Sequence, residues 1–162
     1  MAFLASFYGV LQYFNKEFLW PNVLNPYGGR SVSTFGNPNF LSSFNVIMFP
    51  IAVVLFLQAK DTFQRIAYGT VVLVVEAALL CSLTRSSWIG AFVAMGVLLF
   101  FKDVRRRIGT EPRSQGLLFG AAVVMVFLWP QTSVSGAYTP SVLGRLTEIT
   151  EVAKKEGFYS PL

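Results

Sequence analysis

Two arginines are the residues of this sequence with the most specific chemistry, because each stands at the polar start of a long apolar run. Arg30 precedes the stretch "STFGNPNF", and Arg85 lies in the short connection "TRSS". A guanidinium carries a permanent charge and donates hydrogen bonds in a planar fork that fits phosphate oxygens. The pattern therefore indicates a binding site for a phosphate-bearing anion, with both arginines as charged ligands.

The residues around the two arginines are typical of helix starts. Asn37 suits the N-cap of one helix and Pro38 its first position, and Thr84, Ser86 or Ser87 suits the cap of the other. A helix amino end presents free N–H donors and about half a positive charge. Two such ends beside two arginines predict a cradle for a diphosphate. The candidate binding residues beside the arginines are Asn37, Asn39, Thr84 and Ser86.

A second interpretation of the arginines stays open. Arg30 also fits an ordinary interfacial side chain that lays its apolar stem along the membrane and extends its charge to water. Arg85 fits this less well, because its short connection joins two short apolar runs and is expected to dip below the lipid headgroups. A cation at that depth is costly and usually functional.

The elements that position these residues are apolar helices. The chain of 162 residues is 54% hydrophobic and 13% charged, whereas soluble domains carry about 25% charged residues. Near-continuous apolar runs predict membrane spans at 38–58, 66–83, 88–101 and 116–129. The first two reach the roughly 17 to 25 residues that a span needs, and the last two must tilt or use flanking residues. The sequence thus predicts an all-α, polytopic transmembrane protein with about four full spans.

Three further parts flank the four-helix segment 38–129. Residues 1–14 are apolar but too short to span, and they lack the basic start of a signal peptide. We expect them to be the end of a transmembrane helix whose beginning is absent. Residues 15–37 are expected to form an extracytoplasmic loop, and residues 130–162 the start of another. These features predict a fragment of a longer protein.

The basic residues predict the orientation in the membrane. Connections 59–65 and 102–115 lie on one side and together carry seven lysines and arginines, including the run "RRR". The positive-inside rule places this side in the cytoplasm, so Arg30 and Arg85 fall outside. The net charge of +5 is explained in this way and does not indicate a nucleic-acid partner. The "RRR" run itself is typical of a solvated face, with contacts to anionic lipid in addition.

Glu76 is a carboxylate in the middle of an expected span. It lies nine residues before Arg85, about 13 Å along one helix, so the two cannot pair. A neutral hydrogen bond to another helix is the favoured interpretation, and a role in proton transfer is the alternative. The alternative predicts a fragment of a polytopic transporter or lipid flippase with Glu76 as its functional carboxylate. The chain has no histidine and a single cysteine, so we expect no metal site, no other cofactor and no internal disulfide.

Three segments resemble a known family. The stretches "YGVLQYF", "NPYGGRSVSTFGNPNFLSSF" and "LTRSSWIG" are similar to successive segments of the O-antigen ligase and polymerase superfamily, and the resemblance covers roughly residues 4–129. Arg30 matches the first arginine of the family. Arg85 matches the arginine of its "SRG" motif, where this chain reads Arg85-Ser86-Ser87 and lacks the glycine.

The resemblance implies a function. Members of this superfamily are multi-pass proteins of the bacterial inner membrane, and they serve the biosynthesis of lipopolysaccharide and other cell-envelope glycans. They transfer a glycan from undecaprenyl diphosphate to an acceptor hydroxyl on the periplasmic face. Arg30 and Arg85 would bind the diphosphate of the lipid-linked donor. The ligase type, the polymerase type and transfer to a protein acceptor all stay open.

The expected partners are the undecaprenyl-diphosphate-linked glycan and the lipid bilayer, and the sequence does not predict the oligomeric state. In the ligases a histidine of a large periplasmic loop is proposed to activate the acceptor. This chain has no histidine and stops at Leu162, near the expected start of that loop. We therefore expect the chain to be inactive alone. A non-catalytic membrane subunit that binds the lipid diphosphate is a third alternative.

Overall fold

The computed structural model describes residues 1–19, 27–130, 133–134 and 137–138 of the chain. Its elements are α1 (Ala2–Tyr13), η2 (Ser33–Phe35), α2 (Pro38–Gln58), α3 (Thr62–Ser82), α4 (Arg85–Leu98), α5 (Lys102–Arg107), α6 (Pro112–Phe127), β1 (Ser133–Val134) and β2 (Ala137–Tyr138). The two short strands pair with each other in an antiparallel manner. The predicted helical class is thus confirmed. The predicted loop 130–162 lies almost entirely outside the described residues.

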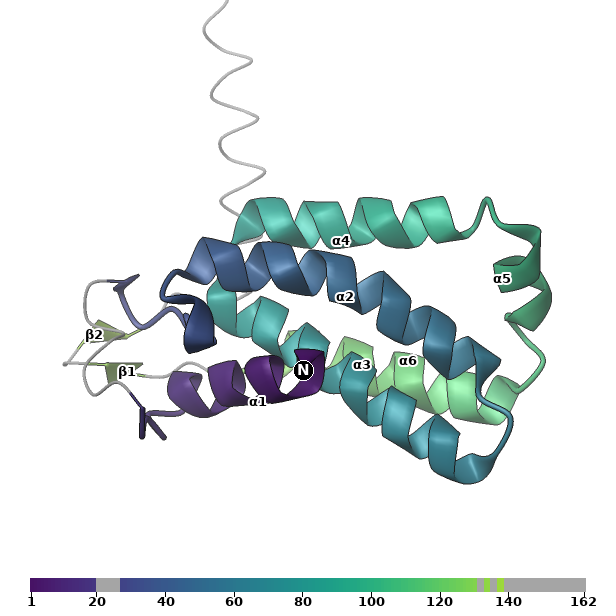
Figure 1. Ribbon diagram of the computed structural model, residues 1–162, viewed down its shortest axis with the longest axis horizontal. Coiled ribbons are helices and arrows are strands. Elements are labelled where there is room, and N and C mark those ends of the chain that lie inside the picture. The colour runs from purple at the N-terminus through teal and green to yellow at the C-terminus, as the bar shows by residue number, and fades with distance from the viewer. Residues whose placement is uncertain (20–26, 131–132, 135–136, 139–162) are drawn as a thin grey trace, which may run out of the picture.

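The longer helices run side by side along the long axis of the molecule (Figure 1). Helices α2 and α4 begin at the end where α1, α3 and α6 finish, and η2 packs there against α1 and α2. We call this the η2 end. Helix α5 lies at the opposite end, which we call the α5 end (Figure 1). The alternation of helix directions brings the connections before α2 and before α4 to the same end of the molecule.

Helix α2 has the bounds that the sequence predicts, 38–58. Asn37 has an extended backbone and forms the N-cap, and its Oδ1 accepts a hydrogen bond from the backbone N–H of Asn39 at 2.8 Å. Pro38 occupies the first helical position, where its missing N–H removes no helical hydrogen bond. A capping residue followed by a proline is a local signal, which explains why this boundary is predictable.

The next helix extends beyond the predicted span, and the next predicted connection contains helical residues. Helix α3 begins at Thr62 rather than at 66, because Asp61 caps it and accepts a hydrogen bond from the backbone N–H of Gln64 at 2.7 Å. The predicted connection 102–115 contains α5 and the first turn of α6, which starts at Pro112. In both cases the helix begins in polar residues, ahead of the apolar run used to place it.

Two of the described helices, α2 and α3, are long and apolar enough to cross a membrane, with 21 residues each. The other two expected spans are shorter. Helix α4 has 14 residues and α6 has 16, so the prediction of four full-length spans is not met in the part of the chain that the structure describes. Helix α4 ends at Leu98, a short turn occupies the last residues of the predicted span, 99–101, and α5 begins at Lys102.

The helices bury small clusters and leave much apolar surface exposed. One buried cluster at the η2 end includes Leu79, Leu80 and Trp88. Helix α6 buries none of its residues, and its Phe119 is 72% exposed. On α4 the side chain of Phe92 is 77% exposed. Apolar surface of this extent is typical of contact with a membrane or with other protein.

Candidate functional site

The segment that follows Arg30 is buried among the helices. Ser31, Val32 and Ser33 are all fully buried. The backbone N–H of Ser31 donates a hydrogen bond to the carbonyl oxygen of Cys81 at 3.1 Å, near the end of α3. A buried backbone group without such a partner is strongly disfavoured. The position of Arg30 is therefore fixed from its carboxyl side by a segment inserted into the helical core.

Gln12 of α1 holds this segment, and the sequence interpretation missed it. The side chain is fully buried, and its Oε1 accepts a hydrogen bond from the backbone N–H of Ser33 at 2.6 Å. The hydroxyl of Ser33 donates to the carbonyl oxygen of Ala5, and that of Ser31 to the carbonyl oxygen of Gly9, each at 2.6 Å. The sequence feature that could have indicated this role is the single amide side chain within the apolar run "YGVLQYF".

The guanidinium of Arg30 joins the amino end of α2 to the connection between α3 and α4. Its Nε donates to the carbonyl oxygen of Ser82 at 2.8 Å. Its Nη2 donates to Oδ1 of Asn39 at 3.0 Å and to Oγ1 of Thr84 at 2.7 Å. These three acceptors are neutral oxygens. Arg30 therefore lies between the two helix starts that the sequence predicts to share a face.

The α3–α4 connection is a tight turn with its own internal hydrogen bonds. Leu83 has a positive φ of 49°, and the hydroxyl of Thr84 also donates to the carbonyl oxygen of Ser82 at 3.2 Å. The indole Nε1 of Trp88 donates to the carbonyl oxygen of Leu79 at 3.0 Å. These bonds fold the start of α4 back onto the end of α3 and fix the acceptors of Arg30.

The starts of α2 and α4 are also linked directly. The hydroxyl of Ser87 donates to the hydroxyl oxygen of Ser42 at 2.8 Å, and both side chains are buried. Arg85 is the first residue of α4, is partly buried and follows Thr84 in the chain. Both predicted arginines are thus at the η2 end, one bonded to Thr84 and the other adjacent to it.

The predicted binding residues divide into three groups. Asn39 and Thr84 contact Arg30 directly. The side-chain oxygen of Asn37 caps α2. Ser86 is exposed in the first turn of α4 and makes no hydrogen bond with any residue that the structure describes. Asn37 thus has a structural role as the cap of α2, and the side chain of Ser86 has no hydrogen-bond partner among the described residues.

The two helix amino ends differ in a way that the sequence did not predict. Asn37 caps α2, whereas α4 has no side-chain cap, because the hydroxyl of its N-cap residue Thr84 donates to Ser82 and accepts from Arg30. The expectation that Thr84 or a neighbouring serine caps α4 is therefore wrong. Uncapped N–H groups at a helix start can donate hydrogen bonds to an anion. The amino end of α4 is therefore a better candidate for anion binding than the amino end of α2.

Glu76 lies in α3, away from the arginines. It is six residues before Ser82, about 9 Å along the helix. Its side chain makes no hydrogen bond with the described residues, and its buried oxygen Oε2 has no partner. The favoured expectation of a hydrogen bond to another helix is thus wrong within the described part of the chain.

Comparison with protein-family models, curated proteins and solved structures finds no match to this chain. Among the described residues there is also no group of His, Cys, Asp or Glu side chains that fits a metal ion. The chemistry of the η2 end therefore depends on the two arginines, the neutral acceptors of Arg30 at Ser82, Asn39 and Thr84, and the start of α4. Such a set of donors and positive charge is suited to an anion with several oxygens.

Proposed function

We propose that this chain is part of a membrane glycosyltransferase of the O-antigen ligase or polymerase type, which transfers a glycan from undecaprenyl diphosphate to an acceptor hydroxyl. The observation that carries the proposal is the position of Arg30, whose guanidinium donates to both Asn39 and Thr84. These residues belong to the two motifs, "GNPN" and "TRSS", on which the resemblance to this superfamily depends. The two motifs that carry the resemblance therefore also lie next to each other in the fold.

The proposal includes insertion in the bacterial inner membrane. Helices α2 and α3 cross it, and the shorter α4 and α6 cross it with the help of flanking residues. The exposed aromatic side chains of α4 and α6 face lipid in this arrangement. The arginine-rich α5 end lies in the cytoplasm, and the η2 end faces the periplasm. The alternating helix directions of Figure 1 support this topology.

In the proposed reaction, the acceptor oxygen bonds to the anomeric carbon of the glycan while the bond from that carbon to the diphosphate oxygen breaks. Arg30 and Arg85 bind the diphosphate and stabilise the negative charge that it gains as it leaves. Arg30 is held in place beforehand by its three neutral acceptors. A base removes the proton of the acceptor hydroxyl. Glu76 is not this base, because it lies within α3, six residues and about 9 Å before Ser82.

Replacement of Arg85 by alanine tests the proposed reaction. In membranes where a protein containing this chain transfers glycan from undecaprenyl diphosphate, Arg85→Ala should abolish transfer. The amount of protein in the membrane fraction should not change, because Arg85 is at the end of α4 and not within its apolar part. Unchanged transfer by the Arg85→Ala protein would remove this residue from the mechanism.

A transporter or lipid flippase is the second candidate function, and the unpartnered Oε2 of Glu76 is the observation that favours it. A buried carboxylate without a hydrogen-bond partner suits a group that gains and loses a proton during transport. For this function, Glu76→Gln should abolish proton-driven lipid or solute movement in reconstituted vesicles and leave diphosphate binding intact. Transport at the unchanged rate would exclude this role.

A further inference from the structure

Two adjoining cavities lie at the α5 end, opposite the arginine site of the η2 end. Their volumes are about 520 and 360 Å³, and Leu57, Arg106 and Arg107 line both of them. The three shared residues place the two cavities next to each other, between the end of α2 and the chain that connects α4 to α6. Neither cavity includes a residue of the proposed glycosyltransferase site.

The larger cavity has an apolar wall. Val54 and Leu57 of α2 and Val104 of α5 form this wall, and the polar side chains that complete the lining are Gln58, Asp103, Arg106 and Arg107. Val54 and Leu57 lie in the last turns of an apolar helix of 21 residues. The wall therefore continues along the apolar length of α2. A hydrocarbon chain that follows α2 is the occupant that suits such a surface.

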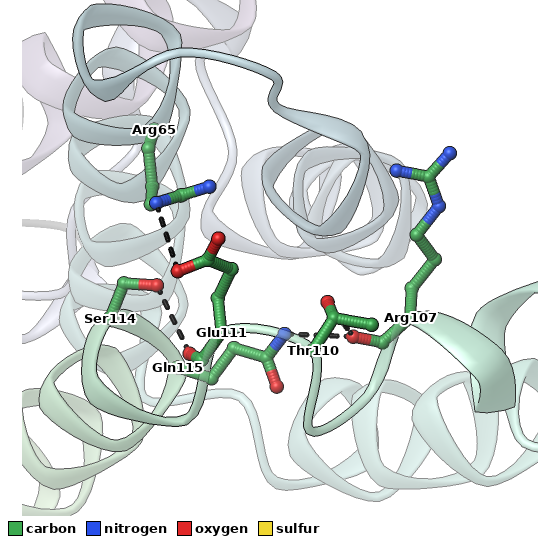
Figure 2. A network of polar contacts seen from close by, with 6 residues as sticks. All are labelled: Arg65, Arg107, Thr110, Glu111, Ser114 and Gln115. Atoms are coloured by element: carbon green, nitrogen blue, oxygen red, sulfur yellow. Dashed lines mark hydrogen bonds and ion pairs between the residues drawn. The ribbon is translucent and has the colours of Figure 1, made fainter.

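The smaller cavity is polar and cationic. Lys60, Arg65, Arg106 and Arg107 line it together with Glu111. Arg65 and Glu111 neutralise each other through an ion pair of 3.3 Å, which Figure 2 shows beside Ser114 and Gln115. In the same view the guanidinium of Arg107 is directed away from this pair. The net charge of the cavity therefore comes from Lys60, Arg106 and Arg107.

These three cations are available for a ligand. Their side chains are exposed and make no ion pair or hydrogen bond with the residues that the structure describes. The cavity walls contain one further carboxylate, Asp103, which lines the larger cavity only. Three cations gathered around a depression of molecular size attract a phosphate group more strongly than single surface charges do.

The turn that carries Arg107 is held in a defined conformation. Gln115 accepts a hydrogen bond from the backbone N–H of Gly109 at 2.7 Å and donates one to the carbonyl oxygen of Arg107 at 2.9 Å. The hydroxyl of Thr110 donates to the same carbonyl oxygen at 2.8 Å (Figure 2). Gly109 has a φ of 85°, a conformation that other residues rarely adopt. The backbone that presents the arginine is thus ordered before any ligand binds.

We propose that the two cavities together bind one anionic phospholipid. Its phosphate lies in the smaller cavity among Lys60, Arg106 and Arg107, and one acyl chain lies in the larger cavity along Val54 and Leu57. Apolar and cationic walls in adjoining cavities match the two chemically different parts of such a lipid. The site is on the arginine-rich side, which the positive-inside rule assigns to the cytoplasm, where anionic lipids attract basic segments.

Lipid retention by the purified chain tests the site. Native mass spectrometry of the full chain in detergent measures binding of dioleoylphosphatidylglycerol, with dioleoylphosphatidylcholine as the uncharged comparison. The double variant Arg106→Gln with Arg107→Gln should lose affinity for the anionic lipid on the order of thirtyfold. Arg106 and Arg107 also influence the orientation of the chain in a membrane. Because the measurement is made in detergent, a change of orientation cannot affect the result.

The matched control removes equal charge from the same region. Arg105→Gln with Arg113→Gln changes two exposed arginines that line neither cavity, and it should weaken binding by less than about threefold, as expected for screened surface charges. Circular dichroism of both double variants should match that of the unchanged chain. Equal losses in the two double variants would overturn the proposal in favour of a diffuse basic surface.

Two further comparisons identify the occupant. An excess of inorganic phosphate should leave the lipid bound, and short-chain dihexanoylphosphatidylglycerol should bind more weakly than the long-chain lipid. Displacement by inorganic phosphate would show a site for free anions and overturn the assignment to a lipid. Equal affinity for short and long chains would overturn the role of the apolar cavity.

Discussion

The guanidinium of Arg30 is oriented by hydrogen bonds to uncharged groups. Three neutral oxygens, from Ser82, Asn39 and Thr84, accept its hydrogen bonds. A lysine carries the same charge but has no planar fork, so it does not reproduce bonds to three separate elements. The guanidinium thus joins two helix starts, and in the proposed function it also supplies positive charge to the diphosphate.

The sequence predicted that Arg30 and Arg85 lie at one end of the molecule, but it did not predict the contacts of Gln12. An arginine beside a helix start is a local pattern, and it is visible in a few consecutive residues. Gln12 acts on Ser33, which is 21 positions further along the chain. No spacing rule connects an amide in an apolar helix with a loop that folds back onto it, so only the packing of α1 against η2 shows this role.

Replacement of Gln12 by leucine is expected to destabilise the chain. The backbone N–H groups of Val32 and Ser33 would lose the buried acceptor Oε1, and one unsatisfied buried group costs about 1–3 kcal/mol. Unfolding in mixed detergent micelles, followed by circular dichroism, measures the change. The control Gln58→Leu alters an exposed amide at the end of α2. Equal stability of the two variants would show that Gln12 does not hold this segment.

At the scale of the helices, local capping signals predicted one start correctly and longer apolar runs misplaced others. The pair Asn37 and Pro38 marked the start of α2 to the residue. The starts of α3 and α6 lie in polar sequence, ahead of the apolar runs that were used to place them. Hydrophobicity reports where a helix meets apolar surroundings, whereas hydrogen bonding at the cap decides where it begins.

The cap of α2 gives a prediction that separates structure from ligand binding. Asn37→Ala should lower the free energy of unfolding by about 0.5–2 kcal/mol, because the N–H of Asn39 loses its acceptor. Asn37→Ser keeps a capping oxygen and should retain most of the stability. Unfolding in mixed micelles compares the two proteins. Equal losses for serine and alanine would contradict the assignment of Asn37 as a structural cap.

At the scale of the whole molecule, the two ends differ in chemistry. The η2 end holds Arg30 within a partly buried polar network, and the α5 end holds exposed arginines around two cavities. The helical class and the sharing of one end by the two motifs were both predictable from alternating apolar runs. The bounds of α4 and α6 were not, because each helix begins in polar residues ahead of its apolar run and ends before the run does, at Leu98 and Phe127.

This arrangement predicts opposite accessibility of the two ends in a cell. In a Cys81→Ala background, a cysteine at the exposed Ser86 should react with a membrane-impermeant thiol reagent in intact spheroplasts. A cysteine at the exposed Thr110 should react only after the membrane is permeabilised. Cys81 is fully buried, so the native background is low in either case. Labelling of both positions in intact cells would contradict the proposed topology.

Binding of undecaprenyl diphosphate by the purified full chain tests the central claim most directly. The unchanged chain should bind this lipid more tightly than undecaprenol, which has no phosphate. Arg30→Gln should weaken binding by about tenfold to a hundredfold, as expected for loss of hydrogen bonds to a charged group. The control Lys16→Gln removes an exposed cation near the end of α1 and should have little effect. Equal affinity of the unchanged and Arg30→Gln chains for undecaprenyl diphosphate would contradict the account.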